Sequence, residues 1–174
     1  LSLSIKGKLM KYVPHALTAL LLLGLTACAS GPRYDTSQVE TNLTASQAAA
    51  APAAHGGARV VWGGVIIVTR NEPSYTEMEI LSYPLDSWQR PDISRSEQGR
   101  FIVRNANYLE AVDYAPGRQV TISGKIEKVM EGKVGEAPYT FPLVQSDEIY
   151  LWPRDGRESS APRFHFGIGV IFGH

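Results

Sequence analysis

Between Arg59 and Trp152 the sequence is a succession of short runs rich in β-branched and aromatic residues, separated by proline and glycine. Helical periodicity is almost absent from this region, so the runs predict an all-β domain. We expect about six short strands within a domain at residues 59–155. The segments expected to supply them are residues 59–69, 76–80, 99–103, 108–110, 119–129, 139–143 and 149–152.

The clearest segment is residues 119–129, in which Val120, Ile122 and Ile126 are predicted to face inward. The side chains predicted to face solvent are Thr121, Ser123, Lys125 and Glu127. Residues 116–124 resemble the strand that recurs in OB-type barrels. An open sheet of short strands would leave its edges free to aggregate, and closure into a barrel removes those edges. We therefore predict a small OB-like β-barrel, with a split β-sandwich as the alternative.

Two local features refine this prediction. Paired glycines, Gly63 and Gly64, interrupt the first run, and glycine inside a strand indicates a bulge or a sharp bend. Residues 131–133, Glu-Gly-Lys, are expected to close a hairpin.

Residues 1–27 are predicted to be a cleaved signal sequence. Three lysines precede an apolar run at residues 16–25, which is shorter than the ~20 residues that span a bilayer. The run ends in Leu25-Thr26-Ala27-Cys28, which resembles the lipobox of bacterial lipoproteins. The resemblance implies cleavage before Cys28, a diacylglyceryl group on its thiol and an acyl chain such as palmitate on its freed amino group.

Two further expectations follow from this region. Met10 begins a signal of ordinary length, so we expect translation to start there. The residue after the cysteine is Ala29 and not the aspartate that retains such lipoproteins in the inner membrane. The resemblance therefore implies an outer-membrane protein, lipid-anchored and facing the periplasm. The alternative, a buried cysteine in an ordinary apolar helix, does not explain the order of these features.

Residues 28–58 are interpreted as the lipidated cysteine and a disordered tether. They are rich in Ala, Ser, Thr, Gln, Pro and Gly, and they contain few large apolar side chains. A flexible chain of this length has a root-mean-square span of roughly 30 Å. The alternative is a short helix through the alanine run at residues 48–54.

The charge and the single cysteine narrow the function classes. Of 17 basic residues three precede Cys28, so the chain after cleavage carries 14 basic and 17 acidic residues. A net negative chain is not expected to bind nucleic acid, whose recognition depends on a basic surface. One cysteine allows no intrachain disulfide.

Catalytic groupings are not evident. His55 falls in the predicted tether, and His165 and His174 fall in a Gly/aromatic C-terminal segment at residues 156–174, so we expect neither a catalytic triad nor a metal site. Glu77 and Glu79 are predicted to share the solvent face of one strand, roughly 7 Å apart. Glycosidase carboxylates can lie at such distances, but a solvated face is the simpler interpretation. No cofactor is expected besides the covalent lipid on Cys28.

The aromatic residues are the remaining candidates for binding. Trp62, Trp88, Tyr139 and Trp152 could form an open barrel face that binds a sugar or a lipid, with Trp88 as the best exposed candidate. In the C-terminal segment Phe164, Phe166, Ile168, Val170 and Phe172 would share one strand face, and the other face is dominated by His165, Gly167, Gly169 and Gly173. This pattern indicates a last barrel strand, a floppy tail, or an edge strand that pairs with a partner or lies on the membrane.

An ordered series of phrases resembles the Slp family of outer-membrane lipoproteins. The phrases are residues 62–66, 79–85, 90–91, 99–101, 114–121, 135–139 and 151–152, and the lipobox matches as well. The resemblance implies a starvation- or stress-associated envelope lipoprotein without established catalytic residues. We therefore expect a non-enzymatic role in envelope maintenance, with outer-membrane lipid as partner and an envelope protein or glycan as a further one. The alternatives are a binding module for an envelope glycan or lipid and, less favoured, an envelope hydrolase.

Overall fold

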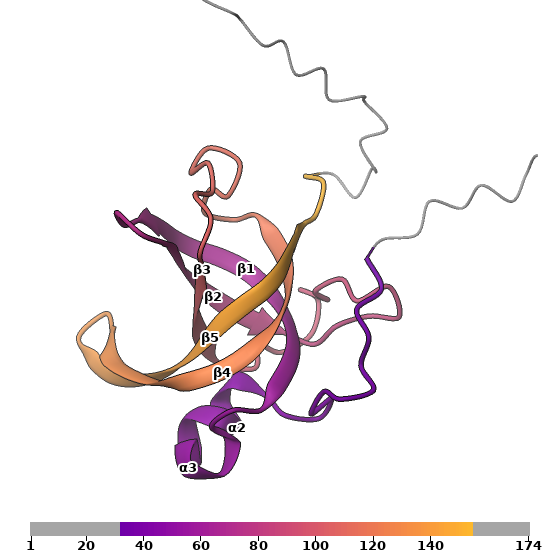
Figure 1. Ribbon diagram of the computed structural model, residues 1–174, viewed down its shortest axis with the longest axis vertical. Helices are drawn as coiled ribbons and strands as arrows, with labels where there is room; N and C mark the ends of the chain where they lie inside the picture. The colour runs from indigo at the N-terminus through magenta and orange to yellow at the C-terminus, as the bar shows by residue number, and fades with distance from the viewer. Residues whose placement is uncertain (1–31, 155–174) are drawn as a thin grey trace, which may run out of the picture. The chain divides into compact units, whose positions relative to one another are not determined.

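A computed structural model describes residues 32–154 (Figure 1). The elements in this part of the chain are α2 (Ala45–Ala50), α3 (Pro52–His55), β1 (Arg59–Asn71), β2 (Thr76–Tyr83), β3 (Arg100–Asn105), β4 (Gln119–Val134) and β5 (Ala137–Leu151). The predicted signal sequence, Cys28, Ala29 and the C-terminal segment 156–174 lie outside the described residues. No helix within residues 32–154 is long and apolar enough to cross a membrane.

The strands form a closed barrel in the order β1-β2-β3-β5-β4. Neighbouring strands are antiparallel except β3 and β5, which are parallel. This is the five-stranded Greek-key arrangement of the OB type. The prediction of an OB-like barrel is confirmed, and the closure excludes a split sandwich.

The strand count is five and not about six, for two reasons. Residues 139–143 and 149–151 belong to one long strand, β5, which pairs with β4 from Leu151 to Ala137, and Trp152 lies just beyond its end. Residues 108–110 lie in the β3–β4 loop and form no strand. The hairpin between β4 and β5 turns at Gly135, whose φ of 60° favours glycine, and not at residues 131–133.

The paired glycines of β1 let neighbouring segments approach the strand closely, and they do not mark a bulge. The register shift between β1 and β2 lies at Ile66 and Val68. A Cβ on Gly64 would overlap the carbonyl oxygen of Leu81, because the β2 backbone approaches β1 closely at that point.

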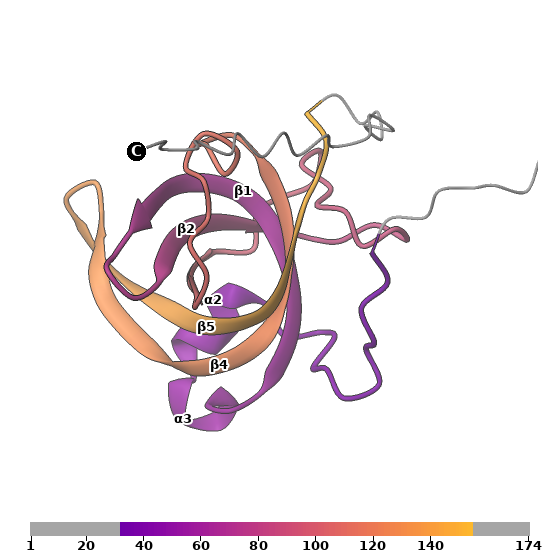
Figure 2. The same ribbon diagram turned by 45° about the horizontal axis from the view of Figure 1, so that its top comes forward.

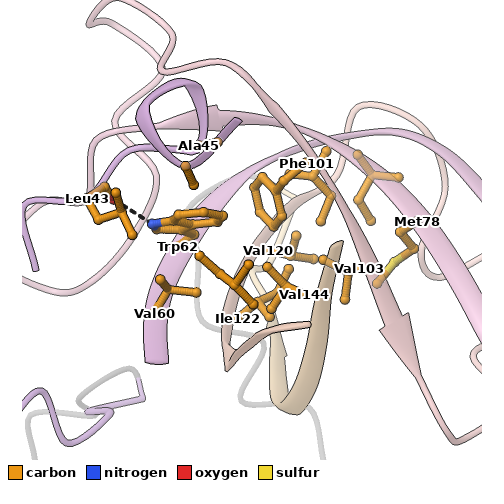
Figure 3. Close-up of a cluster of buried hydrophobic side chains, with 14 residues drawn as sticks. Leu43, Ala45, Val60, Trp62, Met78, Phe101, Val103, Val120, Ile122 and Val144 are labelled. Carbon is orange, nitrogen blue, oxygen red and sulfur yellow. Dashed lines mark hydrogen bonds between the residues drawn. The ribbon is translucent and has the colours of Figure 1, made fainter. Parts of the chain in front are cut away.

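The barrel interior is filled with apolar side chains (Figure 3). Trp62 and Phe101 meet edge to face, with ring centroids 5.1 Å apart. Val120, Ile122 and Ile126 are buried, as predicted from their alternation. Thr121 was predicted to face solvent, and this is wrong, because Thr121 is fully buried. Its hydroxyl donates to the carbonyl of Gln89, and its own carbonyl accepts the hydroxyl of Tyr34, so both segments cover the outside of β4 there.

The predicted disordered tether is also wrong for residues 32–58, and the alternative of a short helix is right. Thr44 caps α2 through a capping box with Gln47. Ala45 and Ala48 are buried in the core cluster, and the indole Nε1 of Trp62 donates to the carbonyl oxygen of Leu43 at 2.7 Å (Figure 3). Figures 1 and 2 show α2 and α3 at one end of the barrel. The composition argument counted large apolar side chains and overlooked that small ones let a helix pack closely.

Candidate functional site: a docked leader and an exposed loop

The four aromatics predicted as a ligand face do not come together. Trp62 lies in the interior and is 6% exposed. Trp152 is 7% exposed, and its Nε1 donates to Thr121 Oγ1 at 2.9 Å. Tyr139 packs on Phe141, and its hydroxyl accepts the backbone N–H of Arg100 at 2.8 Å. Trp88, at 53% exposure, is the one tryptophan that faces solvent. The other three predicted residues are engaged within the protein, so the four do not form a shared stacking face.

The outer face of β3 and β5 is covered by the chain itself. OB folds often bind ligands on the face around strands 2 and 3. Here Ile102, Phe141 and Leu143 form a second buried cluster. The residues packed against it, Met130, Val134 and Tyr139, come from the β4–β5 hairpin. The hairpin therefore supplies this face with its own apolar side chains.

Glu77 and Glu79 are neither free nor fully solvated. Their side chains are 15% and 14% exposed and are held by arginines of β3. The guanidinium of Arg104 donates to Glu77 at 3.0 Å, and that of Arg100 donates to Glu79 at 2.6 Å. Two carboxylates engaged in this way are ill-suited to act as the acid and base of a hydrolase.

The histidine and acidic candidates lie apart. His55 ends α3, and its Nδ1 lies 3.1 Å from Glu40 Oε2. His165 and His174 lie outside the described residues. Within residues 32–154 no three His, Cys, Asp or Glu side chains gather as a metal site would require.

Residues 32–38 follow the predicted signal sequence and Cys28, and we name this short segment the leader. It is docked on the outside of the barrel. The backbone N–H of Tyr34 donates to Gln89 Oε1 at 2.8 Å, and Gln89 Nε2 donates back to the Tyr34 carbonyl at 3.2 Å. The Tyr34 hydroxyl donates to the carbonyl of Thr121 at 3.3 Å. Burial, with a smaller contribution from the Glu148 carboxylate, raises the pKa of the Tyr34 phenol well above its usual range. The leader is therefore fixed at both the backbone and the side chain of Tyr34.

The partner of the leader is the β2–β3 loop, residues 84–99. Its first turn is held by Asp86, whose Oδ1 accepts the N–H groups of Trp88 at 2.8 Å and Arg90 at 2.9 Å. Gln89 adopts a φ of 61°, which is uncommon for a residue with a side chain. The carbonyl of Gln89 accepts the hydroxyl of Thr121 at 2.6 Å. The turn is thus bonded to the barrel on one side and to the leader on the other.

A second turn follows in the same loop. Asp92 Oδ1 accepts the hydroxyl of Ser94 at 2.6 Å and its N–H at 3.1 Å. These two hydrogen bonds lower the pKa of the Asp92 carboxyl, the hydroxyl having the larger effect. Between them Ile93 is 54% exposed. The loop therefore displays two large apolar side chains, Trp88 and Ile93, from two separately fixed turns.

Sequence reasoning missed Tyr34 and Gln89. One signal was available, since Tyr34 is the only aromatic residue in segment 28–58. A single large aromatic side chain in a segment of small and polar residues indicates a point at which the segment docks on the folded domain. Gln89 carries no comparable signal, because its role depends on a backbone conformation that the sequence does not reveal.

Comparison with known proteins decides the family. A family model described as the outer membrane lipoprotein Slp family matches residues 25–170. The chain belongs to this family. It is 32% identical over 166 residues to the outer membrane protein Slp of Escherichia coli strain K12, covering 94% of this chain and 88% of that protein. It is 26% identical over 177 residues to the uncharacterized lipoprotein YeaY of the same strain, covering 99% and 90%.

These matches confirm the family resemblance and identify the chain as a member of an outer-membrane lipoprotein family. Among solved structures it is similar to the mitochondrial single-stranded DNA-binding protein Rim1 of S. cerevisiae, with a TM-score of 0.36 and 14% identity over 55% of this chain and 94% of that one. A small single-stranded DNA-binding protein from Streptomyces coelicolor gives a TM-score of 0.33 at 14% identity, with the same coverage. Scores this low carry no argument about a ligand.

Proposed function

We propose that this chain is a non-enzymatic outer-membrane lipoprotein whose barrel is held against the periplasmic leaflet by acyl chains on Cys28. The observation that carries the proposal is the docked leader. Five residues separate Cys28 from Tyr34. A fully extended chain advances at most about 3.6 Å per residue, so the Cα atoms of Cys28 and Tyr34 can be no more than about 22 Å apart.

This geometry differs from a protein on a long flexible tether. The folded region begins within a few residues of the lipid, so the barrel has little freedom to leave the membrane surface. Two or three acyl chains bind a bilayer essentially irreversibly, at about 0.8 kcal/mol per buried CH₂ group. A domain anchored so closely acts at the membrane surface.

A non-enzymatic role is supported by the state of the candidate chemical groups. The two best-placed carboxylates, Glu77 and Glu79, each hold an arginine. The outer face of β3 and β5 is covered by the hairpin cluster. We infer that the barrel serves envelope maintenance under stress, as the family resemblance implies, through contacts with membrane lipid and with envelope proteins or glycans.

The lipid anchor is tested in a Gram-negative host by intact-mass spectrometry and membrane fractionation. The mature protein is expected to begin at Cys28, to carry the mass of a diacylglyceryl group with an added acyl chain, and to fractionate with the outer membrane. Cys28→Ser is expected to remain uncleaved and without lipid. A native protein with an unmodified Cys28 would overturn the proposal.

Sorting and orientation are tested with a matched pair of variants. Ala29→Asp is expected to move the protein to the inner membrane, whereas Ala29→Ser leaves it in the outer membrane. Protease added to intact cells is expected to spare the barrel, and protease added after permeabilisation to cleave exposed loops. Cleavage in intact cells would show that the barrel faces outward.

A further inference from the structure

The β2–β3 loop exposes apolar side chains that it could have buried. Trp88 and Ile93 are 53% and 54% exposed, although Leu85 and Pro91 of the same loop pack over Gly63 of the barrel. Hydrogen bonds to Asp86 and Asp92 hold each turn in place. The exposure is therefore built into the loop and does not result from a lack of fixed structure.

The loop is also the part of the molecule that binds the backbone of the leader. Tyr34 makes both of its backbone hydrogen bonds to Gln89, the residue directly after Trp88. Figures 1 and 2 both show the leader running along the side of the barrel that carries this loop. The Cα atoms of Cys28 and Tyr34 can be no more than about 22 Å apart, so the proposed lipid anchor would bring a leaflet surface within reach of the loop.

The charge of the loop favours an apolar contact over an electrostatic one. It carries three acidic residues, Asp86, Asp92 and Glu97, and two basic ones, Arg90 and Arg95. Arg90 is already engaged, since its Nε donates to Gln119 at 2.9 Å and its guanidinium lies over the Trp152 ring. Tryptophan is enriched at membrane–water interfaces, where its ring is partly apolar and its N–H can be solvated.

From these observations we propose that the β2–β3 loop is a membrane-docking edge, with Trp88 and Ile93 inserted into the headgroup region of the phospholipid leaflet that holds Cys28. The inference rests on the proposed lipid anchor. The lipid would set the distance of the barrel from the membrane, and the loop would set its orientation. Because the loop is not basic, its insertion is expected to be insensitive to salt and to the fraction of anionic lipid.

The test uses the complete lipidated protein in vesicles of phosphatidylethanolamine and phosphatidylglycerol. Trp62 and Trp152 are buried, so acrylamide quenching of tryptophan emission in water reports chiefly on Trp88. Vesicles are expected to lower this quenching severalfold, and brominated phospholipids to quench Trp88. Trp88→Phe removes both effects and Ile93→Ser weakens them. Raising the salt concentration changes neither.

A matched reporter separates insertion of the loop from general proximity to the bilayer. Tyr108 is 67% exposed and belongs to the β3–β4 loop, which lies away from the leader in both views. Tyr108→Trp in the Trp88→Phe background is expected to stay accessible to acrylamide and to escape quenching by brominated lipid. Equal quenching of the two reporters, or continued exposure of Trp88 on vesicles, would overturn the docking edge.

Failure of the anchor is detected separately. Flotation of the vesicles and the mass of Cys28 show whether the protein is lipidated and bound. A protein that does not float contradicts the proposed function and the docking edge together. A protein that floats with Trp88 exposed contradicts the docking edge alone. Shielding of Trp88 in cells but not on vesicles would assign the loop to a protein partner and would also overturn the proposal.

Discussion

The β4–β5 hairpin and the β2–β3 loop project from opposite sides of the barrel and are attached to it in different ways (Figures 1 and 2). The hairpin buries Phe141, which is 5% exposed in a cluster with Ile102 and Leu143, and partly buries Tyr139 against it. The loop and the leader are attached largely by hydrogen bonds, through Asp86, Gln89 and Tyr34, and Trp88 faces solvent. The same chain therefore covers one face of its barrel and presents an apolar residue on the other side.

The largest expected difference between these regions is in stability. Phe141→Ala is expected to lower the free energy of unfolding by about 3–5 kcal/mol, because it leaves a cavity in the hairpin cluster. Trp88→Ala is the matched control on the loop and is expected to change it by no more than about 0.5 kcal/mol. Urea unfolding of the parent protein and the two variants, each solubilised in detergent, measures both. Similar losses for the two variants would show that Trp88 packs on the barrel.

Next in size is the polar attachment of the leader. Gln89→Ala removes both hydrogen bonds to the backbone of Tyr34 and is expected to cost about 1–3 kcal/mol. It is also expected to make the leader cleavable by protease near Tyr34 while the strands remain resistant. Limited proteolysis with mass spectrometry measures this, and Gln98→Ala, in the same loop, serves as control. A leader that stays resistant in Gln89→Ala would place its attachment elsewhere.

A smaller effect is expected from the ion pairs on the outer face of β2 and β3. Arg100 and Glu79 are partly exposed, so solvent screens their attraction. A double-mutant cycle with Arg100→Gln and Glu79→Gln is expected to give a coupling of about 0.5–1 kcal/mol that decreases with added salt. Urea unfolding of the four proteins provides the values. A coupling that salt leaves unchanged would mean that the pair is more deeply buried than the structure shows.

The smallest effect is expected from the hydroxyl of Tyr34. Tyr34→Phe is expected to cost about 0.5 kcal/mol at neutral pH, since the hydrogen bond to Thr121 is long at 3.3 Å. The folded-state pKa of Tyr34 is raised, so its contribution to stability is complete below the ordinary tyrosine pKa and is lost as the pH rises above it. Stability measured above pH ~10 should therefore decline less steeply in Tyr34→Phe than in the parent protein. Equal slopes would show that Tyr34 ionises freely.

The fold was predictable where alternation and turn residues were clear. The inward row Val120, Ile122 and Ile126 followed from alternation alone. The closed barrel followed from the cost of open sheet edges and from the resemblance of residues 116–124 to an OB-type strand. The unity of β5 was hidden because the polar residues Ser146, Asp147 and Glu148 interrupt its apolar pattern, although Ser146 and Glu148 pair with β4 on either side of a register shift. Whether a strand continues through polar residues depends on its pairing with a strand that is distant in sequence. A local pattern of apolar and polar residues carries no information about that pairing.

The site was less predictable than the fold, because it depends on which surfaces other segments cover. Trp62 and Trp152 were candidates for a binding face until the structure placed Leu43 and Thr121 against their indole N–H groups. Trp88 was correctly singled out as the exposed tryptophan. Segment 32–58 was misread as a tether because alanine and threonine seldom form a core. In α2 the small alanines pack closely against the barrel, and Thr44 caps the helix.

Amide hydrogen exchange at Tyr34 in the lipidated protein tests most directly whether the leader is docked. Its N–H donates to Gln89 Oε1, so the account predicts strong protection, and loss of that protection in Gln89→Ala. The amide of Ala48, which is bonded to the Thr44 carbonyl within α2, should stay protected in both proteins. Exchange of the Tyr34 amide at the rate of an unstructured chain, with Ala48 still protected, would contradict the docked leader and restore a flexible tether ahead of α2.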